Sequence, residues 1–489
     1  MGRKSDHHQP AVLLLLLELL LAIPSTSAKA GVELSSSVIL FYDSELATPM
    51  YGSAVPQCEL LLRRAVRHGG KRIQLVPTHY WYDKRYESQD QNACLPDNWA
   101  DTDLRVDCYC SKWAWDAPCK PFTKESIASV RDAMRKCLSL AVQLYEEVLI
   151  APHLDRVAGS SKRGKWRNML RFDPLQKDRH GNSYWEIMLQ PLLQAANDAF
   201  NSSKGKTLHF AMGGEMGGTL LNHPAQYLKI FNATRAAWKA PARLQLGVTF
   251  YHAYTPGQIN HQPDLKGVKP LPDSPLGTLD GGYGPLLPYD KWPGVAQLRA
   301  VLPDFKRLLQ EAQFIGVSNY ARAPADVQPS HMEGSTAKLL AEFAAMGVDT
   351  QQLLSSGKQL IWNEFGLGGG IGSCNDVPGI DARIGLFPWL GITGSYEQKI
   401  DPFKQSLAAK EYLKKYYAAA LQLLAAGGGR YPVHGAYMWN VASWDVQGIH
   451  TSAAVWNTSV VQADWPVRKG FAVADVAGMI QAHNTRFRH

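Results

Sequence analysis

The sequence is poor in charge: 19% of its 489 residues are Asp, Glu, Lys or Arg, whereas 45% are hydrophobic. Disordered chains show the opposite balance, so this composition excludes wholesale disorder and favours a folded globular protein. The net charge is a modest +8, and the basic residues are dispersed along the chain. A nucleic-acid-binding domain gathers them on one stripe or patch, so we expect no nucleic-acid partner.

Long hydrophobic runs are missing too, with one exception near the N-terminus, over residues 11–23. This run is too short to span a bilayer, which needs about 20 apolar residues, and Glu18 interrupts it. Arg3 and Lys4 precede it and small residues follow it, which is the order found in a secretory signal peptide. We therefore expect residues 1–30 to be cleaved, with an uncleaved signal anchor as the alternative. The mature chain is then expected to be secreted, extracellular or in a cell wall, without membrane attachment.

Cysteine is sparse, at seven residues. Four lie in one polar, tryptophan-rich segment (Cys94, Cys108, Cys110 and Cys119), while Cys58, Cys137 and Cys374 lie apart. A zinc site needs two close pairs or histidine partners at ligand spacing, and the segment has neither, so no metal is expected. In an oxidising compartment we expect two disulfides to hold this segment, with the pairing left open. Sequons compatible with glycosylation occur at Asn201, Asn232 and Asn457.

Sequence motifs of nucleotide, metal and serine chemistry are also absent. The glycine-rich stretch 366–372 lacks the spacing G-x-G-x-x-G of dinucleotide-binding loops, and no phosphate-binding P-loop occurs. The segment 316–320 resembles the hydrolase elbow G-x-S-x-G, but its last residue is Tyr320 instead of glycine. Neither H-E-x-x-H nor the chitinase-like run D-x-x-D-x-D-x-E is present. We therefore expect no cofactor.

What the sequence does contain is an alternation of short β-rich apolar runs with amphipathic helical stretches. The strand-like runs are Val38–Tyr42, Arg72–Pro77, Val148–Ala151, Leu208–Met212, Leu244–Phe250, Phe314–Ser318, Gln359–Trp362 and Val433–Trp439. A helical pattern follows each strand, and several of these helices end on glycine. Eight such units predict an α/β fold with a single (β/α)8 TIM barrel over residues 31–489, and a doubly wound open sheet is the alternative.

The predicted strands are unevenly spaced along the chain. The surplus over the ~30 residues of a bare βα unit lies after the second, third, fifth and seventh strands. It covers residues 78–122, 152–183, 251–294 and 364–402, and the first segment holds a Cys-rich insertion at about 79–123. Loops after strands lie on the C-terminal face of a barrel, where the active sites of this fold are found. The long loops therefore indicate that this face carries the function.

Two glutamates stand directly after apolar strands at that face. Glu215 follows the fourth strand in Phe210-Ala-Met-Gly-Gly-Glu215, and Glu364 follows the seventh in Ile361-Trp-Asn-Glu364. Cleavage of a glycosidic bond needs such a pair, because one carboxyl protonates the leaving oxygen while the other attacks the anomeric carbon or activates water. One glutamate at a strand end is often a solvated or ion-paired residue, but the two together favour a catalytic pair.

This pattern resembles clan A of the glycoside hydrolases, in particular its endo-β-mannanase and cellulase-like families. The resemblance implies a retaining (β/α)8 enzyme with Glu215 as acid/base and Glu364 as nucleophile. It also implies that Tyr320, after strand six, orients the nucleophile and that Trp439, after strand eight, forms the floor of a sugar subsite. Many members carry Asn directly before the acid/base, where this chain has Gly214. The mannanase families depart from Asn too, which favours a mannan-like substrate.

Further candidates follow from the chemistry of pyranoses, whose C–H faces pack on aromatic rings and whose hydroxyls need polar partners. The candidate substrate-binding residues are His79, Trp81, His252, Asn319, Tyr320, Asn363 and Trp439. The histidines and tryptophans among them also fit a purely structural role in packing. The most basic stretch, residues 162–171, is either a solvated face or, if it lines the cleft, an indication of an acidic polysaccharide.

The sequence therefore predicts a secreted, retaining, endo-acting glycosidase that cleaves a β-linked polysaccharide by double displacement. A polysaccharide or oligosaccharide substrate is the expected partner, and the oligomeric state is left open. The alternative is a catalytically inactive carbohydrate-binding or cell-wall protein on the same barrel. Such a protein would keep the aromatic residues but would need neither glutamate.

Overall fold

The structure is a computed structural model that describes residues 30–41, 56–83, 105–111, 119–156, 167–251, 295–321, 323–366, 407–439 and 474–487. The expected signal peptide up to residue 29, much of the Cys-rich insertion, His252 and Asn457 lie outside these residues. Among the described helices, none combines the length and the apolar character that a membrane span requires.

Eight parallel strands close into a barrel, as the sequence predicts. β1 pairs with β2 on one side and with β10 on the other, and the order β1-β10-β9-β8-β7-β6-β4-β2 completes the ring. Its strands are β1 (Leu34–Phe41), β2 (Arg72–Tyr82), β4 (Glu147–Ile150), β6 (Thr207–Ala211), β7 (Arg243–Phe250), β8 (Phe314–Asn319), β9 (Gln359–Phe365) and β10 (Gly435–Met438). The doubly wound alternative is excluded, because such a sheet keeps two open edges.

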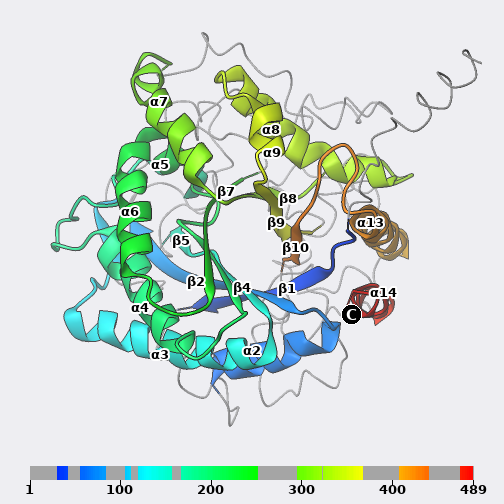
Figure 1. The fold of residues 1–489 in the computed structure, drawn as a ribbon, viewed down its shortest axis with the longest axis horizontal. Coiled ribbons are helices and arrows are strands. Elements are labelled where there is room, and N and C mark those ends of the chain that lie inside the picture. Colours follow the sequence, from blue (N-terminus) through cyan, green and yellow to red (C-terminus); the bar gives the residue numbers. More distant parts are fainter. Residues whose placement is uncertain are drawn as a thin grey trace, which may run out of the picture.

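Helices surround this ring of strands (Figure 1). They are α2 (Gln57–Ala65), α3 (Lys124–Leu144), α4 (Gln190–Ala199), α5 (Gly217–Asn222), α6 (Pro224–Ala237), α7 (Val295–Glu311), α8 (Gly334–Ala345), α9 (Thr350–Ser355), α13 (Leu407–Ala425) and α14 (Ala474–Thr485). Short 3-10 turns lie at η1 (Val66–His68), η4 (Arg167–Met169) and η8 (Pro329–Glu333), and a π-helical turn, η5 (Trp185–Leu189), leads into α4.

The barrel wall is extended at its C-terminal end beside β2. That strand continues to Tyr82, beyond the Pro77 at which the sequence pattern ends, and pairs there with two further strands. β3 (Cys108–Cys110) lies antiparallel to it, and β5 (His153–Arg156) lies parallel to it. β5 directly prolongs β4 after a break at Pro152, which has no N–H to donate to a strand ladder. This extension carries the side chains of β5 to the rim of the barrel.

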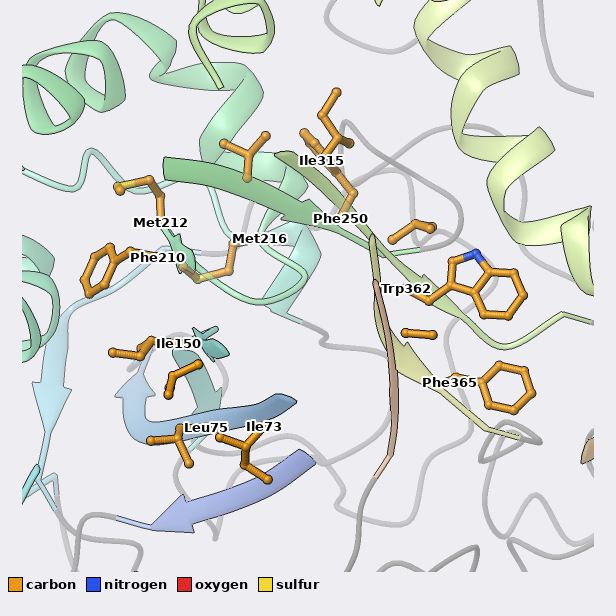
Figure 2. Close-up of a cluster of buried hydrophobic side chains, with 14 of the residues drawn as sticks. Ile73, Leu75, Ile150, Phe210, Met212, Met216, Phe250, Ile315, Trp362 and Phe365 are labelled. Carbon is orange, nitrogen blue, oxygen red and sulfur yellow. The ribbon is translucent and has the colours of Figure 1, made fainter. Parts of the chain in front are cut away.

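Alternate residues of each strand face opposite sides of the barrel wall. The outward set packs against the helices in one large cluster, and Figure 2 shows Ile315, Trp362 and Phe365 pointing away from the ring. The inward apolar set is much smaller and consists of Leu149, Ala151, Ala211, Phe314, Ile361 and Tyr437. The stability of the barrel therefore comes mainly from the strand–helix layer, which leaves the inner face of the rim for polar side chains.

Two disulfides are described, and they differ from the expected pair. Cys110–Cys119 closes a short loop in the Cys-rich segment, as expected, but Cys58–Cys137 joins α2 to α3 outside it. Within the described residues Cys108 is a buried free thiol, so the described part of the segment holds one bridge, and Cys94 lies outside the described residues. The pairing of Cys58 with Cys137 has no signal in the sequence, because only the packing of the two helices brings them together.

Loss of the bridge between α2 and α3 is expected to destabilise the protein more than loss of the short one. The sequence separations are 79 for Cys58–Cys137 and 9 for Cys110–Cys119. Loop-closure entropy alone corresponds to about 4.5 and about 2.7 kcal/mol respectively at 25 °C. In urea denaturation, Cys58→Ala/Cys137→Ala should therefore lower the free energy of unfolding by about 2 kcal/mol more than Cys110→Ala/Cys119→Ala. Equal losses would contradict this entropic reading.

Candidate active site

Glu215 and Glu364 meet at the C-terminal end of the barrel. Their residues are 1% and 2% exposed, and their carboxyl groups lie close enough for the charge of Glu364 to raise the pKa of Glu215. An inverting glycosidase holds its carboxyls about 6.5–9.5 Å apart to admit a water, whereas a retaining one holds them at about 5–5.5 Å. The separation of the two carboxyls is therefore what distinguishes a retaining from an inverting reaction at such a site.

An extra residue in β9 turns Glu364 into the barrel. Glu364 pairs with Ser318 of β8, while Trp362 pairs with the residue before Ser318, so Asn363 is left without a partner in the ladder. The register towards β10 shifts at the same place. Trp362 and Phe365 both pack outward and stack on each other, which places Asn363 and Glu364 on the inside. A β-bulge re-aims side chains in this way.

Glu215 is presented by a constrained turn after β6. It has a φ of 55°, and no other described residue except glycine has a positive φ. That backbone conformation costs roughly 1–3 kcal/mol for a residue with a side chain. Two hydrogen bonds hold the turn: Thr249 Oγ1 donates to the Gly213 carbonyl at 2.5 Å, and the Gly214 N–H donates to the Pro152 carbonyl at 2.7 Å. Strands on both sides of β6 therefore fix the position of Glu215.

His153 explains why residue 214 is glycine. A Cβ at Gly214 would lie 2.2 Å from Cδ2 and 2.5 Å from Nε2 of the His153 ring, so any other residue would collide with it. The ring is fully buried, lies with Nε2 3.0 Å from Glu364 Oε1, and stacks on Trp439 with a centroid distance of 5.4 Å. Neither ring nitrogen has an aligned hydrogen-bond partner among the described residues. His153 thus fills the space that an amide side chain at position 214 would occupy.

Arg167 is the cation of the site. Its Nη1 lies 2.6 Å from Glu215 Oε2, and its Nε and Nη2 lie 3.1 and 2.5 Å from Asp155 Oδ1. Arg167 belongs to the basic stretch 162–171, for which an acidic substrate was one interpretation. In the structure its guanidinium already binds two carboxylates of the protein. Its position therefore gives no support to the acidic-substrate interpretation.

Protonation of the pair follows from burial and contact. Burial and the charge of Glu364 raise the pKa of Glu215 to about 7, against the effects of Arg167 and His153. Burial raises the pKa of Glu364 to about 7, against Arg167 and the hydrogen bond from Tyr320. Burial lowers the pKa of His153 to about 3, so its imidazole is neutral. Two neighbouring buried carboxyls resist double ionisation, so a charge on one makes a charge on the other harder to form.

Three of the expected substrate-binding residues lie at this pair. The hydroxyl of Tyr320 donates to Glu364 Oε2 at 2.7 Å. Asn363 Nδ2 donates to Ser318 Oγ at 3.3 Å, and Ser318 lowers the pKa of Glu215. Trp439 reaches the site through its stacking on His153. These contacts join the ends of β8, β9 and β10 around the two carboxyls.

Three other expected residues lie elsewhere. His79 donates from Nε2 to the Ile187 carbonyl and packs on Phe122, and Trp81 lies in the outer cluster with the helices. Asn319 donates to the Met332 carbonyl at 2.9 Å. His79 and Trp81 occupy the outward positions of β2, a fact that nearness to a strand end does not reveal. His252 lies outside the described residues.

Four residues of the site escaped the sequence reasoning: His153, Asp155, Ser318 and the role of Arg167. One signal was available, because His153 closely follows the apolar run Val148–Ala151, as the two glutamates follow theirs. Among the described residues, the one cluster of possible metal ligands is Cys108, Cys110 and Cys119. Two of these are joined in a disulfide, so the cluster cannot hold an ion as it stands.

Comparison with known proteins gives only distant similarities. No protein-family model matches the chain, and no curated protein matches it in sequence. One similar solved structure is a complex of a GH113 β-1,4-mannanase, with 10% identity and a TM-score of 0.41, covering 93% of this chain and 99% of that one. Another is the GH113 β-mannanase AaManA from Alicyclobacillus acidocaldarius in complex with ManMIm, with 13% identity and a TM-score of 0.39, covering 93% and 98%.

Gly214→Ala is expected to destabilise the protein, because its Cβ would overlap the His153 ring. Overpacking of this kind costs about 1–3 kcal/mol, and His153→Ala in the same chain should recover part of the loss. Gly478→Ala in α14 is the matched control, since a Cβ there meets nothing within 4 Å. Thermal unfolding of the four variants measures the effect. A Gly214→Ala variant as stable as Gly478→Ala would show that His153 does not constrain this position.

Glu364→Gln is expected to be more stable than the wild type at alkaline pH. A carboxyl whose pKa rises from about 4.3 in the unfolded chain destabilises the folded state progressively as the pH rises towards the folded pKa. That pKa is about 7, so the variant should gain roughly 1–3 kcal/mol at pH 8 and nothing near pH 4. Urea denaturation at both pH values measures this difference. Glu311→Gln, on the exposed side of α7, should show no such gain, and a pH-independent gain at Glu364 would contradict the buried-charge account.

Proposed function

We propose that this protein is a retaining glycoside hydrolase in which Glu364 is the nucleophile and Glu215 the acid/base. The observation that carries the proposal is a pair of buried, neighbouring carboxyls at the C-terminal end of a (β/α)8 barrel, held by Arg167 at 2.6 Å and by Tyr320 at 2.7 Å, in which ionisation of one opposes ionisation of the other. Glycoside cleavage by double displacement requires this combination of one protonated and one ionised carboxyl.

The hydrogen-bond partners support this division of roles. Tyr320 donates to Oε2 of Glu364, which stabilises its ionised form and leaves Oε1 for attack. In the first step Glu364 bonds to the anomeric carbon while the glycosidic C–O bond breaks, and Glu215 gives its proton to the departing oxygen. In the second step Glu215 takes a proton from water, the water oxygen bonds to the anomeric carbon, and the ester to Glu364 breaks. Both carboxyls then return to their starting state.

The substrate proposed is a β-linked polysaccharide, with mannan favoured and attack within the chain. Trp439 offers an aromatic face at the site, and sugar rings pack their C–H faces on such surfaces. Gly214 departs from the Asn of many clan A enzymes, as the mannanase families do, and His153 occupies the adjoining space. Export of the chain and a single catalytic domain over residues 31–489 belong to the same proposal.

A substrate screen with three variants tests the proposal. The wild type should release reducing ends from mannan more readily than from glucan, xylan or galactan, and NMR should show products that keep the anomeric configuration. Glu364→Gln should abolish turnover. Glu215→Ala should slow cleavage of the polysaccharide by about 10²–10⁴-fold, and much less for an aryl glycoside whose leaving group needs no proton.

Glu311→Gln on α7 is the control and should hydrolyse like the wild type. Inverted products would contradict the double displacement. Sugar binding without any turnover in the wild type would instead support the inactive carbohydrate-binding alternative.

A further inference from the structure

Arg167 and Asp155 form a charge pair behind Glu215. Arg167 lies on η4 and is 8% exposed, while Asp155 lies on β5 at the edge of the site. The guanidinium uses Nη1 for Glu215 Oε2 at 2.6 Å and both Nε and Nη2 for Asp155 Oδ1. Three directed donors on two carboxylates hold the guanidinium in one orientation. Nothing in this arrangement requires contact with a sugar.

We propose that Arg167 is a positioning residue that determines which oxygen of Glu215 carries the proton, and that Asp155 moderates the charge of Arg167. This inference rests on the proposed role of Glu215 as acid/base. A guanidinium has only donors, so an oxygen that accepts from it at 2.6 Å cannot also carry a proton towards it. Oε2 of Glu215 is therefore the anchored oxygen, and the proton for the leaving group sits on Oε1.

The charges around Glu215 explain why Asp155 is needed. Among the described residues, the groups that act on its charge are the guanidinium of Arg167, the ring of His153, the hydroxyl of Ser318 and the carboxyl of Glu364, which accepts a hydrogen bond from Tyr320. Arg167 alone would keep Glu215 ionised and unable to act as an acid. Asp155 offsets that charge, while burial and Glu364 favour the protonated form.

Two substitutions should therefore shift the titration of the site in opposite directions. Asp155→Asn keeps an acceptor oxygen for Arg167 but removes the offsetting charge, so the pKa of Glu215 should fall. Arg167→Gln removes the cation, so that pKa should rise. Each shift should be about one pH unit, or tenfold in the ratio of protonated to ionised form. Arg167→Lys keeps the positive charge but loses the directed donors of the guanidinium. The pKa of Glu215 should therefore stay near its wild-type value, while kcat falls with little change in KM.

The primary measurement is a ¹³C NMR titration of the glutamate carboxyls in the full-length chain, assigned with Glu215→Gln and Glu364→Gln. The basic limb of the kcat/KM profile should move in the same directions as the NMR pKa values. Arg235→Gln is the matched control, because Arg235 pairs with Glu311 at 3.0 Å on the exposed surface. It should change neither the titration nor the profile.

Shifts of the same sign in Asp155→Asn and Arg167→Gln, or none in folded variants, would overturn the inference. If Arg167→Gln does not fold, Asp155→Asn is sufficient by itself. A pKa of Glu215 that does not fall in that variant would overturn the inference. Absence of hydrolysis in the wild type would refute the proposed function, and the NMR titration would still decide whether Arg167 and Asp155 control the protonation of Glu215.

Discussion

Two carboxyl groups buried beside each other set the requirements for the whole C-terminal end of this barrel. An isolated charge in such a place is costly, and a carboxyl pair escapes that cost only by sharing a proton and by accepting hydrogen bonds from its surroundings. The donors are Arg167 for Glu215 and Tyr320 for Glu364. These residues come from segments far apart in the sequence, so the site exists only when the ring of strands is closed.

The irregular features of the backbone gather at the same place. The bulge at Asn363 turns Glu364 inward, and the positive φ of Glu215 presents its carboxyl. The absence of a side chain at Gly214 leaves room for the His153 ring. Each departs from the regular geometry of the strands below, and each has a cost in stability. The regular part of the barrel offsets that cost, because its outward side chains pack against the helices in one continuous cluster (Figure 2). Strain at a functional site that is supported by a regular scaffold is a common division of labour in proteins.

The sequence predicted the eight strands and the meeting of the two glutamates, because both depend on local patterns. Apolar runs followed by helical periodicity mark βα units, and a polar residue directly after such a run lies at the C-terminal end of the barrel. Which face a residue takes depends on register, which is why His79 and Trp81 turn out to pack against helices. Arg167 lies in a basic stretch that reads as a solvated surface. Only the folded chain shows that Asp155 and Glu215 receive its guanidinium, because these partners belong to different strands.

The closeness of the two buried carboxyls also sets a condition on the proposed reaction. In the proposed double displacement, a sugar ring that enters between Glu215 and Glu364 needs their carboxyls about 5–5.5 Å apart. If each carboxyl had only the other as a partner, that separation would leave a buried group unsatisfied, at a cost of about 1–3 kcal/mol or more. Arg167 holds Glu215 through one oxygen, and Tyr320 holds Glu364 through one of its own. Each carboxyl therefore keeps a hydrogen-bond partner within the protein whatever the separation of the pair.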